Sequence, residues 1–364
     1  MKKLVFNSQI LENTDRYDAD FSLPDYIYDK NGMLDREKTL DLMLHEEYGY
    51  VNTDGISVSV VCTAEDTHDV YAGKCKSHKT LLFTLSRGDQ GASFPVDLFI
   101  PNTDEDCPLV VALDFDLNAQ KCYCPLEEIL GQNVTVARIL YTDVTSDDKD
   151  FSNGIARLLS DRKDPHSAGK LAIWAYAASL VGGYMLEKGY VKEGDLYVSG
   201  HSRLGKTALL AAAIDTRFAG AHSNNSGCSG VSVSRQKEGE SVNIITDWFP
   251  HWFAPNYRKY ADRENEMPFD QHYMTALIAP RLLSVATAED DTWADTYAQY
   301  ISLEAASVIY EKHGLVGLDS SQGLMKTGMQ SDKGQIGLTM RKGTHYFSRD
   351  DWNFFIGFIK SKKA

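Results

Sequence analysis

The chain has 364 residues, a formal net charge of −14 and 43% hydrophobic residues, which together allow one large domain with a sizeable core. The acidic excess disfavours a nucleic-acid partner, because binding to a phosphate backbone depends on clustered Lys and Arg. No apolar run is long enough to predict a membrane span, and the run after Met1 is too short for a secretory signal. We therefore expect a cytoplasmic protein without a membrane partner.

The cysteines show no spacing that is typical of a metal site or of a small disulfide scaffold. Cys122 and Cys124 form only a C-x-C pair, which is a weak signal. The others are isolated: Cys62, Cys75, Cys107 and Cys228. We expect reduced thiols and neither a metal nor a cofactor.

The first part of the chain, residues 1–55, is polar and mixed, with one amphipathic helix predicted over 35–48. We expect these residues to form an N-terminal extension that packs on the core. Three β-rich runs follow, at 56–62, 80–85 and 94–100, and the last alternates apolar and polar residues before Pro101. This pattern predicts antiparallel strands that open a sheet.

From residue 108 onwards the pattern changes to apolar runs that alternate with helical segments. Continuous apolar runs are typical of strands that are buried on both faces, and alternation with helices predicts a mostly parallel sheet. Residues 56–364 are therefore expected to form one α/β domain, an α/β-hydrolase fold with three layers. The predicted strands are 108–115, 134–140, 195–199, 218–222, 281–287 and 335–340, and the predicted helices are 168–187, 206–214 and 351–359.

Ser202 is the candidate nucleophile. It lies in Gly200-His-Ser-Arg-Leu-Gly205, between a predicted buried strand and a predicted helix. Such a turn lifts a serine hydroxyl above the sheet edge, and the free N–H groups of the following helix suit an oxyanion. The second glycine stands one place later than in the usual G-x-S-x-G pattern. His201 is interpreted as structural, because adjacent side chains on a tight turn diverge.

The chain order of this fold is serine, acid, histidine, so the general base must follow the last strand. His345 lies in the loop after that strand, whereas His313 stands at a helix end. His345 is therefore the predicted base. The acid is expected after the strand 281–287, where the candidates are Glu289, Asp290, Asp291 and Asp295. The residues alone leave all four open, because acids also favour helix starts.

The serine turn resembles that of the glucuronoyl esterases of carbohydrate esterase family 15, particularly the bacterial branch, whose turn reads G-C-S-R-x-G-K. The likeness continues through most of the chain after Pro108, in the segments 225–230, 249–253, 268–272, 276–281, 291–295 and 343–345. It implies an esterase that cleaves glucuronoyl esters, of the kind found in glucuronoxylan, without a cofactor.

The resemblance also implies roles for single residues. Ser202 matches the nucleophile, His345 the base and Asp291 the acid of many bacterial members. Arg203 matches the arginine that helps to form the oxyanion hole, and Lys206 a lysine that contacts sugar hydroxyls. The last match is Trp293, which corresponds to a tryptophan near the bound uronic acid.

Two positions depart from the family pattern. His201 stands where the family has Cys, and Asn225 stands where fungal members place a catalytic Glu. Because an amide carries no negative charge, the acid must then come from Asp291. Two other interpretations stay open: a carbohydrate acetyl esterase or small-ester hydrolase on the same scaffold, and a catalytically silent carbohydrate-binding relative, which Asn225 favours.

Arg203 and Lys206 place two positive charges in the first turns of a helix, where they oppose the helix dipole. We expect something in the pocket to offset them, and a sugar on the acyl side of the ester would do so through its hydroxyls.

Overall fold

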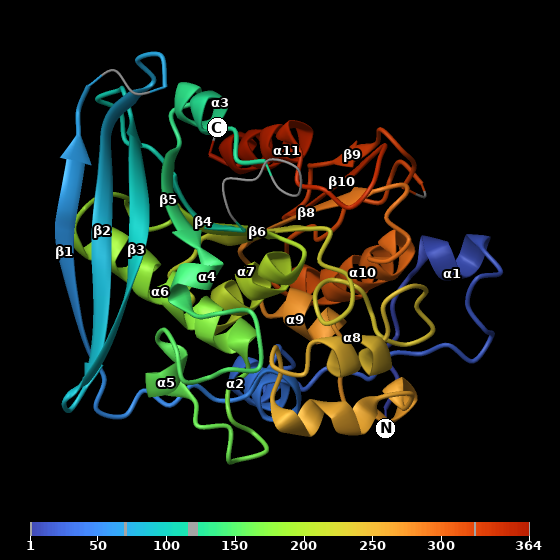
Figure 1. Cartoon of the computed structure of the whole chain (residues 1–364). Coiled ribbons are helices and arrows are strands. Elements are labelled where there is room, and N and C mark those ends of the chain that lie inside the picture. Colours follow the sequence, from blue (N-terminus) through green and yellow to red (C-terminus); the bar gives the residue numbers. More distant parts are fainter. Residues whose placement is uncertain (1, 69–70, 116–122, 324, 364) are drawn as a thin grey trace.

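The computed structural model describes residues 2–68, 71–115, 123–323 and 325–363. Its centre is a ten-stranded sheet in the order β1-β2-β3-β5-β4-β6-β7-β8-β10-β9. Figure 1 shows the sheet crossing the molecule, with helices on both of its faces. The predicted α/β class and mostly parallel sheet are therefore confirmed, and the layers are those of an α/β hydrolase.

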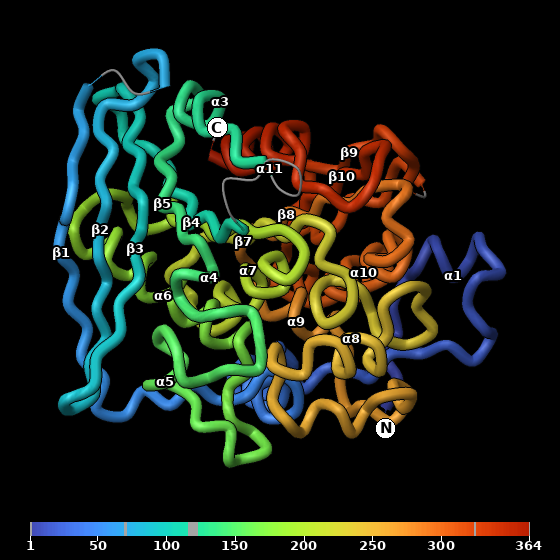
Figure 2. The backbone as a smooth tube through the Cα atoms, viewed as in Figure 1, coloured from blue at the N-terminus to red at the C-terminus, as the bar shows by residue number. Residues whose placement is uncertain are grey.

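The strands divide into an antiparallel and a parallel part, which Figure 2 traces from the blue edge towards the red edge. β1 (Ser57–Asp66), β2 (Cys75–Arg87) and β3 (Gln90–Pro101) pair antiparallel, and β3 pairs antiparallel with β5. All pairs from β5 to β10 are parallel, and β9 closes the far edge antiparallel. These strands are β4 (Leu109–Asp114), β5 (Thr135–Leu140), β6 (Leu196–His201), β7 (Gly220–Asn224), β8 (Leu282–Ala288), β9 (Gln330–Ser331) and β10 (Ile336–Arg341).

The parallel strands are buried on both faces, as their continuous apolar sequences predict. In β4, Leu109, Val111 and Leu113 belong to the larger hydrophobic cluster, and Val110 and Ala112 belong to the smaller one. Successive side chains of a strand point to opposite faces, so β4 holds both layers of helices on the sheet.

The larger cluster includes α6 (Lys170–Glu187), α7 (Arg203–Ile214), α9 (His272–Ala276) and α10 (Thr296–Lys312), and the smaller one includes α3 (Leu126–Gly131) and α11 (Arg349–Ser361). Shorter elements lie in the connections. They are α1 (Gln9–Asn13), α2 (Arg36–Met43), the π-helix η1 (Leu44–Tyr48), α4 (Tyr141–Val144), α5 (Ala156–Leu159), α8 (Val242–Trp248), η2 (Pro255–Tyr260) and η3 (Glu264–Glu266).

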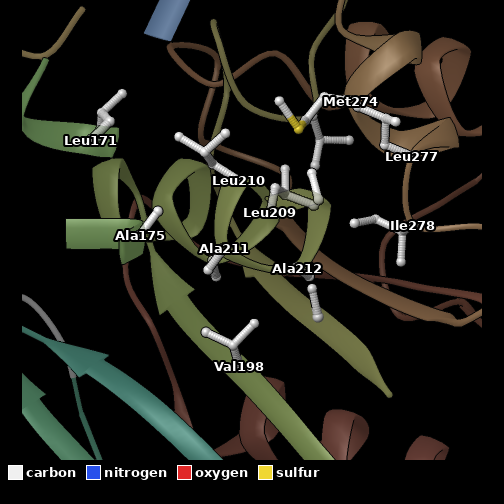
Figure 3. Packing of buried hydrophobic residues seen from close by; sticks show 14 of the residues in the cluster. Leu171, Ala175, Val198, Leu209, Leu210, Ala211, Ala212, Met274, Leu277 and Ile278 are labelled. Carbon is white, nitrogen blue, oxygen red and sulfur yellow. The ribbon is translucent and has the colours of Figure 1, made fainter. Parts of the chain in front are cut away.

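Helix α7 is the buried element that carries the serine turn. Figure 3 shows its leucines and alanines packed between Val198 of β6 and the side chains around Met274 and Leu277. All ten residues from Leu204 to Ala213 are buried, and the alanines allow the helix to approach its neighbours closely. The first turn of α7 is thereby held at the carboxyl end of β6.

The N-terminal residues share the main core. Ile10, Met43 and Tyr48 are fully buried in the larger cluster. The predicted helix over 35–48 is α2, which continues into the π-helix η1. Within the described ranges, no helix is both long and apolar enough to cross a bilayer. The five described cysteines are unpaired, and Cys122 lies outside the described residues.

Candidate active site

Ser202 connects β6 to α7 in a sharp turn. Its backbone has φ of +56° and ψ of −125°, a conformation that is strained for a residue with a Cβ atom. The backbone N–H of Ser202 donates to the carbonyl oxygen of Asn224, 2.8 Å away on the neighbouring strand β7. This contact holds the strained turn, so the serine hydroxyl is presented at the sheet edge.

Two glycines make the turn possible. A Cβ atom on Gly200 would collide with the carbonyl group of Leu204, in the first turn of the helix. A Cβ atom on Gly205 would lie 3.1 Å from both the Ser223 hydroxyl oxygen and the Ser226 Cβ, against the end of β7. The glycine that stands one place late in the motif therefore lets α7 pack closely on the sheet.

His345 and Asp291 complete a hydrogen-bonded relay with Ser202. The distance from His345 Nε2 to Ser202 Oγ is 2.9 Å, and that from His345 Nδ1 to Asp291 Oδ2 is 2.7 Å. A carboxylate only accepts hydrogen bonds, so Nδ1 carries the proton and Nε2 accepts from the serine hydroxyl. This is the arrangement by which a histidine removes a proton from a nucleophile.

The environment of Asp291 keeps it ionised. Its side chain is buried, and it accepts hydrogen bonds from the Ala294 N–H at 3.2 Å and from Asn225 Nδ2 at 2.6 Å. Burial alone would raise the pKa of Asp291, but His345 and the hydrogen bonds outweigh burial and lower that pKa below its usual value. Asp291 is therefore a carboxylate in the resting site.

The other acids of the same loop lie elsewhere. Glu289 and Asp290 are exposed. Asp295 caps α10 by accepting from the Ala298 N–H at 3.1 Å, and it pairs with Arg16 at 2.6 Å. Of the four candidates, Asp291 is the one that contacts the imidazole.

Asn225 supports the acid. From the sequence, it was noted only because it stands where fungal members place a catalytic Glu. It follows β7, with φ of +46°, and its amide donates to the same Asp291 oxygen that His345 contacts. Asn225 thus supplies a donor to the acid in place of a second acid. An intact relay next to this amide counts against a silent relative.

Arg203 lines the cavity beside Ser202 and is held on two sides. Its guanidinium forms an ion pair with Asp147 and lies 4.6 Å from the ring centroid of Trp252. Asp147 also accepts from His251 Nε2 at 3.0 Å and from Trp252 Nε1 at 2.6 Å. Burial opposes ionisation of Asp147, but these donors and Arg203 hold its pKa well below its usual range.

Lys206 is buried, and its ammonium group contacts three acceptors. They are the carbonyl oxygens of Ser226 at 2.5 Å and Cys228 at 2.6 Å, and Glu240 Oε2 at 3.4 Å. An ammonium has three protons, so each has an acceptor.

The two cations therefore need no bound substrate to offset their charge. Asp147 neutralises Arg203, and Glu240 neutralises Lys206, from loops far along the chain. This corrects the expectation that their unfavourable position on the helix requires a sugar. Neither carboxylate belongs to a recognisable motif, so no sequence signal pointed to them.

The cavity beside the serine has a volume of about 190 Å³. Trp293 lines it and stacks on Trp248, with 5.6 Å between the ring centroids. Both tryptophans are substantially exposed, at 39% and 59%, which is unusual for large aromatic side chains. The cavity thus combines the reactive serine, two cations and aromatic walls. Its lining comprises Ser202, Arg203, Lys206, Asn225, Ser226, Gly227, Glu240, Trp248, Phe249, Trp252, Trp293, Ala294 and His345.

Comparison with known proteins agrees with this arrangement. The family described as "Glucuronyl esterase, fungi" matches residues 83–314, which is more than half of the chain. A carbohydrate esterase from an unknown prokaryotic organism is 36% identical over 237 residues, covering 64% of this chain and 54% of that protein. A 4-O-methyl-glucuronoyl methylesterase from Podospora anserina is 30% identical over 183 residues, covering 47% and 38%. The chain thus spans about half or less of the length of these relatives.

Solved structures match over nearly the whole chain. The glucuronoyl esterase from Solibacter usitatus superposes with a TM-score of 0.83 at 27% identity, covering 94% of this chain and 98% of that one. A promiscuous esterase of carbohydrate esterase family 15 from a marine bacterial metagenome gives a TM-score of 0.80 at 26% identity, covering 93% and 97%. The serine turn, the relay and these matches agree, and the chain belongs to the glucuronoyl esterases of carbohydrate esterase family 15.

Proposed function

We propose that this protein hydrolyses esters of glucuronic acid or 4-O-methyl-glucuronic acid, with the sugar on the acyl side of the ester. The observation that carries the proposal is the continuous relay from Asp291 through His345 to Ser202, beside a cavity with sugar-compatible walls. Relatives named 4-O-methyl-glucuronoyl methylesterase, from Podospora anserina and Phanerochaete chrysosporium, support the choice of substrate.

The proposed reaction uses the relay in the following way. Ser202 Oγ attacks the ester carbonyl carbon while His345 Nε2, at 2.9 Å, takes its proton. Asp291 stabilises the imidazolium that forms. We assign the contacts to the developing oxyanion to backbone N–H groups at the start of α7 and to the Arg203 guanidinium, which lines the same cavity. His345 then returns the proton to the departing alcohol, and water attacks the acyl-enzyme with His345 again as the base.

The sugar is assigned to the acyl side because of the wall next to Ser202. Lys206 and Glu240 line the cavity and offer a donor and an acceptor to ring hydroxyls, while Trp293 offers an aromatic face. Replacement of the 3.4 Å contact between Lys206 and Glu240 by a hydroxyl bridging them would keep both charges partnered. An acetyl group is too small to reach either side chain.

A substrate panel tests the proposal: methyl glucuronate and benzyl glucuronate beside acetylated sugars and a simple acetyl ester, with the Ser202→Ala variant as the blank. We expect the highest kcat/KM on the glucuronates. Faster turnover of acetylated sugars would favour the carbohydrate acetyl esterase instead. Turnover of none of these esters would reject the proposed substrate class.

A further inference from the structure

His201 directly precedes the nucleophile but points its ring at the base. The ring centroids of His201 and His345 are 4.5 Å apart, and their planes are tilted by 46°. His201 is almost fully buried, with 2% of its surface exposed. Its Nδ1 lies 2.5 Å from Asn224 Oδ1, so the amide oxygen fixes the ring from behind. His201 is therefore a rigid surface next to a more exposed imidazole.

The His345 imidazole needs such a surface. It stands in the loop after β10, and 38% of its side chain is exposed. Its two ring nitrogens form hydrogen bonds with Asp291 and Ser202. Bonds at these two atoms leave the ring able to rock about the line that joins them. A contact against the ring suppresses that motion and keeps Nε2 aligned with the serine oxygen.

The supporting ring is also uncharged. Burial, and then the neighbouring His345, lower the pKa of His201 to about 3. The hydrogen bond to Asn224 and then Asp291 act in the opposite direction and raise this pKa, and Arg341 adds to the lowering. A neutral ring matters here because His345 becomes an imidazolium during proton transfer, and a second positive charge beside it would oppose that step.

We propose that His201 is a positioning residue that supports the ring of His345 with a neutral aromatic surface and so sustains the reactivity of Ser202. His201 acts through His345 and does not touch the substrate. The inference rests on the relay of the proposed function but not on the identity of the ester.

The test measures serine reactivity with an alkyl fluorophosphonate, which needs no sugar. Ser202 Oγ forms a bond to phosphorus, fluoride leaves, and the serine proton passes to His345. His201→Phe keeps a ring without the Asn224 bond, whereas His201→Gln offers a polar partner to Asn224 without a ring. We expect the inactivation rate of His201→Phe to stay within about threefold of the parent and that of His201→Gln to fall by roughly 10- to 100-fold.

The same split is expected in turnover, with kcat falling in His201→Gln while KM stays within about twofold. His222 on β7 provides a matched control. It is equally buried, and burial also lowers its pKa to about 3. It stacks on Phe347 and Phe355. His222→Gln should lower Tm by about as much as His201→Gln does. It should not slow phosphonylation of Ser202.

Normal reactivity of His201→Gln would overturn the inference, and so would an equal loss in His222→Gln. Equal losses in His201→Phe and His201→Gln would also overturn it, because the hydrogen bond to Asn224, and not the ring, would then be what matters. If the parent reacts with the fluorophosphonate but hydrolyses no glucuronate, the proposed function fails. The inactivation rates of the His201 and His222 variants still decide this inference.

Discussion

The parallel and antiparallel parts of the sheet differ in how deeply their strands are buried and in whether their loops carry catalytic residues. The parallel strands β4 to β8 are buried nearly throughout, and the loops after β6, β8 and β10 carry Ser202, Asp291 and His345. At the opposite edge, β1 is exposed along almost its whole length. The larger cavity, about 1090 Å³, lies between that edge and α6, yet the relay lies beside the cavity of about 190 Å³. The catalytic residues thus lie at the carboxyl ends of the parallel strands and not beside the larger of these two cavities.

The reason is geometrical. Parallel strands bring all of their carboxyl ends to one edge of the sheet, so residues far apart in sequence meet there. Helix α7 begins at the same edge, directly after Ser202, and no side chain caps the N–H groups of its first turn. Antiparallel strands alternate in direction and gather no such set of ends. The predictions below test this contrast, from the largest expected effect to the smallest.

The largest effect is expected for Ser202→Ala, at the end of β6. Loss of the nucleophile should reduce kcat on methyl glucuronate by roughly 10⁶-fold, because removal of a triad serine abolishes covalent catalysis. Far-UV circular dichroism and Tm check that the variant folds. A folded variant with activity near that of the parent would exclude Ser202 as the nucleophile.

Asp291→Asn, after β8, should lower kcat by on the order of 10⁴-fold, because an amide no longer stabilises the imidazolium and favours the wrong tautomer. KM should change little, since Asp291 is buried behind His345 and is not a lining residue of the cavity. Asp290→Asn is the matched control, because Asp290 is the next residue in the chain and its carboxylate is exposed. Equal losses in both variants would contradict the assignment of the acid.

Lys206→Met should lower kcat/KM on methyl glucuronate by about tenfold or more, the worth of hydrogen bonds to a charged group. It should barely affect a simple acetyl ester. Because the change leaves Glu240 buried without its cation, the double variant Lys206→Met/Glu240→Gln and a Tm measurement separate folding from specificity. Similar losses on both esters would remove the argument for an acyl-side sugar.

Glu304 of α10 contacts the N-terminal residues, and its titration should make the stability of the protein depend on pH. It accepts from the Ser8 hydroxyl at 2.8 Å and the Gln9 N–H at 3.0 Å, and burial raises the pKa of Glu304 to about 7. Between its usual value of 4.5 and about 7, the unfolded chain releases a proton that the folded chain keeps, so this group's contribution to stability falls as pH rises. Over that range, thermal melts should show Tm of the parent falling more than that of Glu304→Gln.

The smallest effect is expected for Val61→Lys in β1. Val61 is 60% exposed, so the added charge meets water and the free energy of unfolding should change by no more than about 0.5 kcal/mol. The kcat/KM on methyl glucuronate should equal that of the parent. A clear loss of activity would show that the antiparallel edge contributes to the site, contrary to the contrast drawn above.

The strand pattern and the serine turn could be predicted because both depend on short stretches of sequence. Continuous apolar runs marked the parallel strands, and Gly200, Ser202 and Gly205 marked the turn. The position of His345 followed from chain order alone. For the strands and the turn, the residues that determine the feature are neighbours in the chain, whereas His345 was identified by its place after the last strand.

The partners of those residues depended on the tertiary structure. Four acids stand in one loop, and only the packing of that loop against Asn225 and His345 directs Asp291 towards the imidazole. Asp147 and Glu240 reach Arg203 and Lys206 from separate loops. The sequence by itself thus determined the strands of the parallel sheet, the longer helices such as α6, α7 and α11, and where the nucleophile lies, but it did not mark α8 or α9. The choice of acid and the counter-ions of the pocket were decided only by folding, because the direction of a loop side chain depends on contacts with residues distant in the chain.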